Sequence, residues 1–167
     1  RNPCDSGGKK VGIISGYKDT CCAGERTRGV LDALSDTDYE IQFTINVTYE
    51  TSITEMFMQQ KPVDYLIVLE TGILEEIAKI LSDKQENGMK VYGIGSSIKC
   101  VYYLDEAVID GLIVVDGYDM GYQSVLQISD MLKKRLHRTK DQATDYRLLH
   151  REDIFSEDTQ KFLYTFY

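Results

Sequence analysis

Short apolar runs alternate with amphipathic segments along most of this chain, and this alternation constrains its fold more than any other feature. KVGIIS at residues 10–15 and DYLIVL at residues 64–69 are apolar nearly throughout, as strands buried inside a parallel sheet are. The intervening segments repeat apolar residues every three or four positions, and residues 72–85 place Ile73, Ile77 and Leu81 on one helical stripe.

The expected elements follow one another along the chain. Strands are expected at residues 10–15, 39–47, 64–69, 90–94 and 112–115, with a last strand at residues 146–149. Helices are expected at residues 23–34, 52–59, 72–85, 100–108 and 121–136. Asp19 or Thr20 is the expected N-cap of the first helix, and the Asn-Gly pair at 87–88 is expected to end the third. Residues 154–166 are expected to form a tail with scattered aromatic side chains.

This order of elements predicts an α/β fold with a doubly wound, mainly parallel sheet and helices on both faces. In such folds a ligand binds at the carboxyl ends of the strands, near the point where the strand order reverses. The loops that leave those strand ends are therefore expected to hold any binding site: residues 16–22, 48–52, 70–71, 95–98 and 116–119.

These loops lack the motifs of the common nucleotide, cofactor and hydrolase sites. No GxxxxGK[ST] phosphate loop, GxGxxG fingerprint or GxSxG elbow is present, and residues 93–95 supply only an isolated GxG. The loop after the first strand also lacks the paired acids of a receiver domain. We therefore expect no catalytic residue and no cofactor. A flavodoxin-like or small α/β enzyme domain stays open as an alternative.

Charge and composition exclude other classes of function. The chain has 19 Lys and Arg residues against 27 Asp and Glu residues, so its net charge of −8 argues against binding nucleic acid through this region. No apolar run reaches the roughly 20 residues that span a bilayer. The first ten residues contain no apolar signal core, so any export signal is expected to lie outside this sequence.

Cysteine and histidine give no sign of a metal site. Cys21 and Cys22 are adjacent, which is not a zinc-ligand spacing. The four cysteines are interpreted as free thiols, with a disulfide from Cys21 or Cys22 to Cys100 as the alternative. His137 and His150 occur late in the chain near charged residues, where solvated side chains are expected.

Four residues in or near the expected loops carry groups that suit a polar, uncharged ligand. Arg28 can clasp hydroxyls or a carboxylate, although pairing with Glu25 or Asp32 on its own helix is the alternative. Tyr49 can stack on the face of a sugar ring or be an ordinary tyrosine at a strand end. Glu70 lies at the end of a central strand, and Asp116 ends the fifth strand or forms an Asp-Gly turn.

The order and spacing of several longer motifs resemble one family. AGERTRGVLDAL at residues 23–34 resembles the helix that opens the second lobe of type 1 periplasmic sugar-binding proteins and LacI-type regulators. The stretches at residues 63–81 and 90–97 resemble that family's next strand–helix unit and following strand. IDGLIVVDGYDMGYQSV at residues 109–125 resembles the crossing back to the first lobe. HREDIFSEDTQKFL at residues 150–163 resembles the tail of exported Gram-positive binders associated with sensor histidine kinases.

The resemblance implies a two-lobed clamshell that closes on a sugar. It assigns Arg28 as the arginine that clasps the sugar, Tyr49 as the stacking aromatic and Glu70 as the polar residue that ends the next strand. Two positions depart from the pattern, because Gly95 stands where an aspartate is usual and Val115 stands where the hinge glutamine is usual, with Asp116 beside it.

The resemblance also divides the chain into parts. Residues 1–116 and 140–167 correspond to the second lobe, and residues 117–139 correspond to a helix that packs on the first lobe, which is expected to be largely absent from this chain. The segment RNPCDSGG stands where a helix normally precedes the first strand. An apolar helix without its lobe predicts a homodimer, a swapped dimer or another partner.

The expected function follows from this resemblance. The chain is expected to be a non-enzymatic, extracytoplasmic solute-binding protein or a lobe of one, in the periplasm or on a cell-surface lipoprotein. It would bind a monosaccharide and serve an ABC permease or a membrane sensor histidine kinase. A cytoplasmic LacI-type effector domain is the first alternative, and a fold retained only for protein contacts is another.

Overall fold

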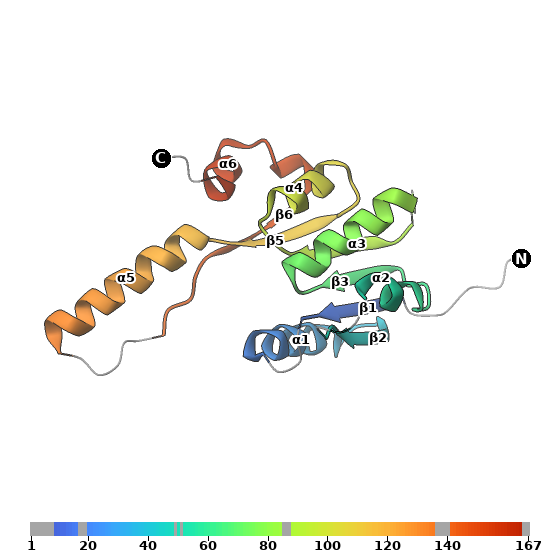
Figure 1. Cartoon of the computed structure of the whole chain (residues 1–167), viewed down its shortest axis with the longest axis horizontal. Helices are drawn as coiled ribbons and strands as arrows, with labels where there is room; N and C mark the ends of the chain where they lie inside the picture. The colour runs from blue at the N-terminus through green and yellow to red at the C-terminus, as the bar shows by residue number, and fades with distance from the viewer. Residues whose placement is uncertain are drawn as a thin grey trace, which may run out of the picture.

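A single six-stranded sheet forms the centre of the molecule in the computed structural model, which describes residues 9–16, 20–48, 50, 52–84, 88–135 and 141–164 (Figure 1). The strand order is β2-β1-β3-β4-β5-β6, and every neighbouring pair is parallel except β5 and β6. The strands are β1 (Lys10–Ser15), β2 (Glu40–Asn46), β3 (Tyr65–Val68), β4 (Lys90–Ile94), β5 (Gly111–Val115) and β6 (Tyr146–Leu149). The expected α/β fold class is confirmed.

The helices lie close to their expected positions. They are α1 (Cys21–Leu34), α2 (Ile53–Met58), α3 (Thr71–Lys84), α4 (Ile98–Asp105), α5 (Gly117–Lys134) and α6 (Glu157–Leu163), with a 3-10 turn η1 (Arg151–Asp153) before α6. Thr20 is the N-cap of α1, which confirms one of the two expected caps. Gly88 has a φ of 138°, as expected of a glycine after a helix, whereas residue 87 lies outside the described residues.

The largest differences from the expected boundaries occur at α4, α5 and α6, where a capping side chain determines the start of the helix. α5 begins at Gly117 rather than 121, because the Asp116 carboxylate caps the backbone N–H of Asp119. α4 begins at Ile98, because Ser97 caps it, and it ends at Asp105, before the C-cap Glu106. The interpretation of residues 154–166 as a tail was wrong for the described residues 154–164, where Ser156 caps α6 and Ile154 is buried.

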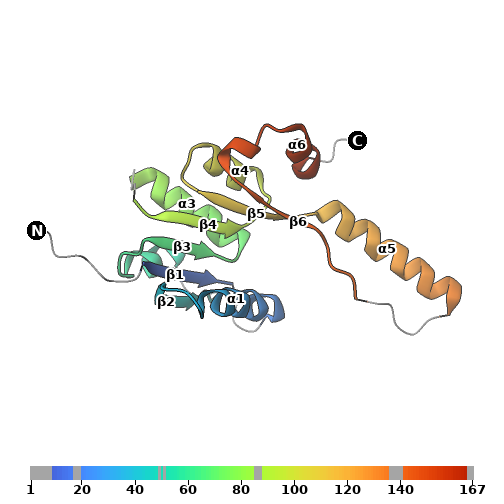
Figure 2. The ribbon, with the colours of Figure 1, turned by 180° about the vertical axis from the view of Figure 1, so that it is seen from behind.

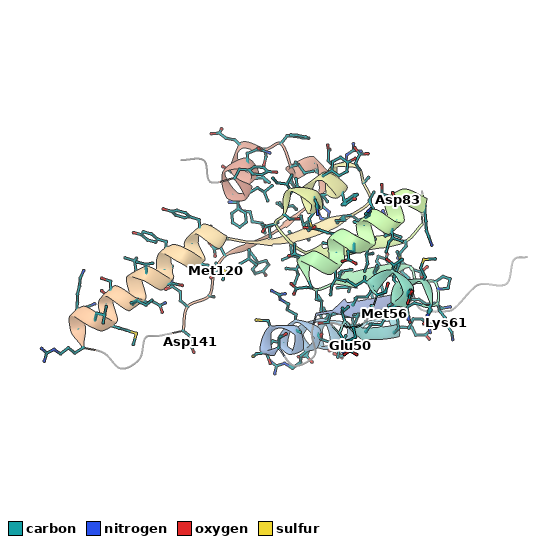
Figure 3. All side chains as sticks on the ribbon, in the orientation of Figure 1. Glu50, Met56, Lys61, Asp83, Met120 and Asp141 are labelled. Atoms are coloured by element: carbon teal, nitrogen blue, oxygen red, sulfur yellow. The ribbon has the colours of Figure 1, made fainter. Side chains whose placement is uncertain are left out.

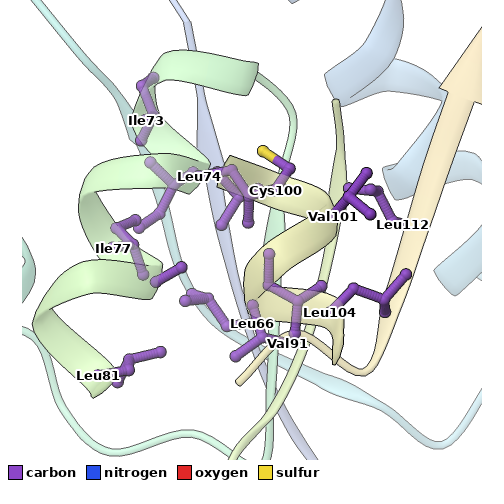
Figure 4. Close-up of a cluster of buried hydrophobic side chains, with 14 of the residues drawn as sticks. Leu66, Ile73, Leu74, Ile77, Leu81, Val91, Cys100, Val101, Leu104 and Leu112 are labelled. Carbon is purple, nitrogen blue, oxygen red and sulfur yellow. The ribbon is translucent and has the colours of Figure 1, made fainter. Parts of the chain in front are cut away.

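Helices α2, α3 and α4 cover one face of the sheet and build the main core. Figure 4 shows the part of this core that α3 and α4 form with the strands. Leu66, Val91 and Leu112 of three neighbouring strands are fully buried against Leu74 and Leu104 of the helices. Cys100 is buried in this core as a free thiol, and burial raises its pKa. Cys21 and Cys22 are exposed and also free, so neither pairs with Cys100.

Among the described residues, α1 is the helix that covers the opposite face of the sheet. Val30 and Leu34 of α1 pack against Val11, Ile13 and Leu69 in a small second core. Side chains of β3, β4 and β5 that point to this face, such as Ile67, Ile94 and Ile113, are only half-buried. The part of the sheet beyond α1 therefore lacks a complete layer of helices.

Helix α5 leaves the body of the molecule and extends into solvent (Figures 1 and 2). It starts where β5 ends, and the chain returns beside it through residues 141–145 to β6. Figure 3 draws side chains around α5 well away from the sheet, with Met120 near its start and Asp141 on the returning segment. No residue of α5 is buried.

Candidate functional site

An arginine–glutamate pair joins α1 to the end of β3 at the carboxyl edge of the sheet. The Arg26 guanidinium donates to the Glu70 carboxylate at 3.2 Å and to the Leu69 carbonyl at 2.9 Å. Both charged side chains stay accessible, with exposed fractions of 36% and 49%. We call this edge, around Arg26, Glu70 and the loop at residues 95–97, the mouth.

The end of β1 explains why α1 brings Arg26 to the mouth. The Thr20 side chain accepts a hydrogen bond from the Ala23 N–H at 3.3 Å and fixes the first turn of α1. The buried Ser15 hydroxyl donates to the Ala23 carbonyl at 3.4 Å, which ties the strand end to that same turn. The Glu70 carboxylate lies beside Gly16, where an added Cβ would be 3.4 Å from it.

Arg28 lies apart from this pair. Its guanidinium forms an ion pair with Glu25 at 2.5 Å on the exposed surface of α1, which is the alternative considered for it from the sequence. Residues two positions apart in a helix point about 200° apart, so Arg26 and Arg28 face opposite ways. Arg26 was missed, although it stands four positions before the core residue Val30 and therefore shares its face.

The other expected residues have different placements. Glu70 is at the mouth and exposed. Asp116 caps α5 through a 2.8 Å hydrogen bond from Asp119 N–H, and its own N–H donates to the Asp145 carbonyl at 3.0 Å. It therefore holds together the two connections between the sheet and α5. Tyr49 lies outside the described residues.

Gly95 lies close to side chains of α3 and α4 at the end of β4. A Cβ on this glycine would lie 3.0 Å from Cys100 Sγ and 3.2 Å from Thr71 Cγ2. An aspartate of the usual family pattern would therefore require the Cys100 and Thr71 side chains to give by a few tenths of an ångström. This mouth consequently relies on groups contributed by other positions.

Polar groups from α3 and α4 extend the mouth along the sheet edge. Lys99 Nζ donates to the Glu75 carboxylate at 3.0 Å, and Ser97 caps α4 by accepting from Cys100 N–H at 3.2 Å. The Ser97 hydroxyl and the Lys99 ammonium lower the pKa of Glu75, whose side chain is 22% exposed. Neither Glu75 nor Lys99 was expected from the sequence, because each stands inside a helical pattern rather than in a loop.

Within the described residues, no group of three or more His, Cys, Asp and Glu side chains is arranged to hold a metal ion. His150 directs its Nδ1 to the Asp110 carbonyl at 2.8 Å, at the opposite edge of the sheet from the mouth. His137 lies outside the described residues. In the part of the chain that the structure describes, no helix is long and apolar enough to cross a membrane.

Solved structures give the relationship that sequence comparison does not. No family model matches the chain, and no curated protein matches it by sequence. A carbohydrate transporter solute-binding protein from Agrobacterium radiobacter, solved with D-arabinose, superposes with a TM-score of 0.81 at 16% identity, over 93% of this chain and 55% of the other. A glucose-galactose binding protein from Geobacillus stearothermophilus superposes with a TM-score of 0.76 at 18% identity, over 90% and 56%.

The chain has the fold of these solute-binding proteins. A protein described as a LacI transcriptional regulator, from Bacteroides fragilis, has it too, with a TM-score of 0.68 at 15% identity over 87% of this chain and 54% of the other. This chain spans about half the length of the solved proteins that it matches. Its sheet and helices therefore correspond to one part of larger, solute-binding molecules.

Proposed function

We propose that this chain is the ligand-binding lobe of an extracytoplasmic solute-binding protein and that its ligand is a monosaccharide. The observation that carries the proposal is the accessible Arg26–Glu70 pair at the mouth. The mouth is where α/β folds of this topology bind ligands. The structural neighbours from Agrobacterium radiobacter and Bacillus halodurans were solved with D-arabinose and myo-inositol.

The chemistry of the pair suits a polyhydroxy compound. A guanidinium offers several N–H donors in a fixed plane, and a carboxylate offers only acceptors. Sugar hydroxyls both donate and accept, so one hydroxyl can satisfy both partners. Because Arg26 and Glu70 already fix each other's position, little rotamer entropy remains to be lost on binding.

The proposal includes a binding role without catalysis. The neighbours named above are binding proteins and a regulator. Residues 1–116 and 140–167 would form the lobe, and the helix at residues 117–139 would pack on a facing lobe, so that closure around the sugar presents a new surface to an ABC permease or a sensor histidine kinase. Tyr49, Glu70 and Asp116 remain predicted ligand contacts, and the variants described below decide between Arg28 and Arg26 as the arginine that contacts the ligand.

The likeness to a LacI-type regulator supports a second candidate, a cytoplasmic effector-binding domain. Cell fractionation separates the two candidates. A protein found outside the cytoplasmic membrane supports the solute-binding protein, and a cytoplasmic protein supports the regulator.

Thermal unfolding with a panel of sugars tests the proposed ligand class. D-arabinose, D-tagatose, D-glucose, D-galactose and myo-inositol are the compounds to add first. A ligand that binds only the folded chain raises Tm by mass action, so at least one of them should raise it by several degrees.

Two arginines on one helix provide a matched pair of variants. Arg26→Ala should abolish the rise in Tm, while Arg28→Ala, which removes an exposed ion pair, should retain it. A rise that survives Arg26→Ala and disappears with Arg28→Ala would assign the ligand to Arg28 instead. No rise with any compound would contradict the proposed ligand class.

A further inference from the structure

The half of the sheet that α1 leaves uncovered forms an apolar groove. Ile67, Ile94 and Ile113 form its floor, and Gly29, Val30 and Ala33 of α1 form one wall. Its volume is about 590 Å³. Central strands of a parallel sheet are normally covered on both faces, and on the other face their side chains are fully buried.

The same chain carries a helix, α5, whose apolar side chains are exposed among the described residues. Tyr118, Tyr122, Val125, Ile128 and Leu132 follow one another at helical spacing on α5, and their exposed fractions lie between 52% and 76%. We call these five residues the α5 stripe. The rings of Tyr118 and Tyr122 are stacked, with centroids 6.1 Å apart. Exposed apolar stripes of this size mark interaction surfaces.

We propose that α5 of one copy packs into the groove of a second copy, so that two copies exchange helices. Topology permits this occupant, since α5 directly follows β5 and the chain returns to the sheet after α5, through residues 141–145. Its own groove is not covered by it, because α5 points away from the sheet in both views (Figures 1 and 2). Exchange of an identical element is a low-cost route to a closed dimer.

Charge complementarity supports the same arrangement. A helix packed beside α1, antiparallel to the strands, would end next to the end of α1. α1 has no basic residue in its last turn and is followed by the exposed Asp36 and Asp38. α5 ends in the exposed residues Lys133 and Lys134, of which Lys134 pairs with Asp130 on the same helix, and the exposed Arg135 follows as its C-cap. Opposite charges would thus meet at this end of the contact.

The size of the contact is sufficient for a dimer. α5 has 18 residues, so it is about 27 Å long and about 10 Å wide. Two symmetric helix–groove contacts then bury on the order of 1,000 Å², counting helix and groove, which is the lower bound for a specific interface.

The exchange has a consequence for the mouth. β5 ends and β6 begins at the carboxyl edge of the sheet, so both connections to α5 leave from the edge that carries Arg26 and Glu70. In this dimer the second copy takes the place of the facing lobe, so two copies that exchange α5 would turn their mouths toward each other across a shared cleft. This second part rests on the proposed function, whereas the exchange of helices does not.

Sedimentation of the 167-residue chain at micromolar concentrations tests the exchange. We expect a particle of about twice the 19.1 kDa chain mass. Val125→Asp on the α5 stripe should halve that mass, and Gln127→Asp on the other side of α5 should not.

Gly29→Arg should block the groove and halve the mass, and Gly24→Arg on the same helix should not. An added Cβ at either glycine meets nothing within 4 Å, so both variants should fold, as circular dichroism will verify.

A mixture of two monomeric variants identifies the contact itself. Val125→Asp keeps an intact groove and Gly29→Arg keeps an intact α5 stripe, so their mixture should form a heterodimer through one helix–groove contact. A dimer that survives Gly29→Arg would mean that two α5 helices pair with each other, and it would overturn the proposal. A monomeric wild-type chain would also overturn the proposal. It would do so whether the backbone amides of α5 are protected from hydrogen exchange by its own groove or exchange freely.

The sugar panel separates failure of this inference from failure of the proposed function. A dimer whose Tm does not change with any sugar would support the helix exchange and contradict the proposed ligand class. A monomer whose Tm rises with a sugar would support the proposed function and contradict the helix exchange.

Discussion

The choice between Arg26 and Arg28 shows how much a single residue's role depends on helical phase. Both arginines belong to the segment that resembles the opening helix of the family, and Arg28 was predicted from its place near the helix start as well as from that resemblance. The apolar positions Val30 and Leu34 define the buried face of α1, and Arg26 lies on that face while Arg28 does not. The spacing thus predicts that Arg26, rather than Arg28, turns toward the sheet. Glu70 was predicted because it ends a central strand, where the topology fixes its position.

Gly95 provides a residue-scale test of the mouth. Gly95→Asp, which restores the usual family residue, should lower the free energy of unfolding by about 1–3 kcal/mol, since its Cβ would press on Cys100 and Thr71. Gly72→Asp in the first turn of α3 is the control, because its Cβ would meet nothing within 4 Å. Urea unfolding measures both. Equal stability of the two variants would contradict the steric account.

Glu75 provides a pH-dependent test. Ser97 and Lys99 lower the pKa of Glu75 in the folded chain, so its contribution to stability is full above the unfolded pKa of about 4.3 and is lost as the pH falls through the lower folded value. Glu75→Gln should therefore destabilise the chain at pH 7 and lose much of that effect at pH 3. Urea unfolding at the two pH values measures the difference. A constant difference would show that Glu75 acts only through packing.

At the scale of elements, local pattern predicted nearly every helix and strand. The apolar runs that became β1, β3 and β4 are buried on at least one face, so their composition was decisive. Boundaries shifted where a cap determined them, as at Asp116. α6 was missed because its aromatic residues were read as scattered, although Ser156 followed by Glu157 and Asp158 is a typical start of a helix.

One helix offers a direct test of the main core. Ile77→Ala on the buried face of α3 should reduce the free energy of unfolding by about 2–5 kcal/mol, because it leaves a cavity among fully buried side chains. Lys79→Ala on the exposed face of the same helix should change it by less than about 0.5 kcal/mol. Comparable losses for both would mean that α3 does not pack on the sheet as described.

At the scale of the whole molecule, the groove could not be predicted from the sequence. The pattern identifies β3, β4 and β5 as buried strands but does not state which helix covers which face. Only the assembled sheet reveals that α2, α3 and α4 cover one face while α1 covers part of the other. The amphipathic pattern of α5 does not show whether the helix packs on its own sheet or on another lobe. Only the family resemblance therefore implied that α5 projects from the sheet.

The central claim is that the mouth binds a monosaccharide, and a sugar titration followed by NMR of the backbone amides tests it most directly. The sugar that raises Tm should move the amide signals of Gly16, Arg26, Glu70 and the loop at residues 95–97, which surround the Arg26–Glu70 pair. Signals at the opposite edge of the sheet, near His150 and Asp110, should stay in place. Changes confined to that opposite edge, or no saturable change at any sugar concentration, would contradict the claim.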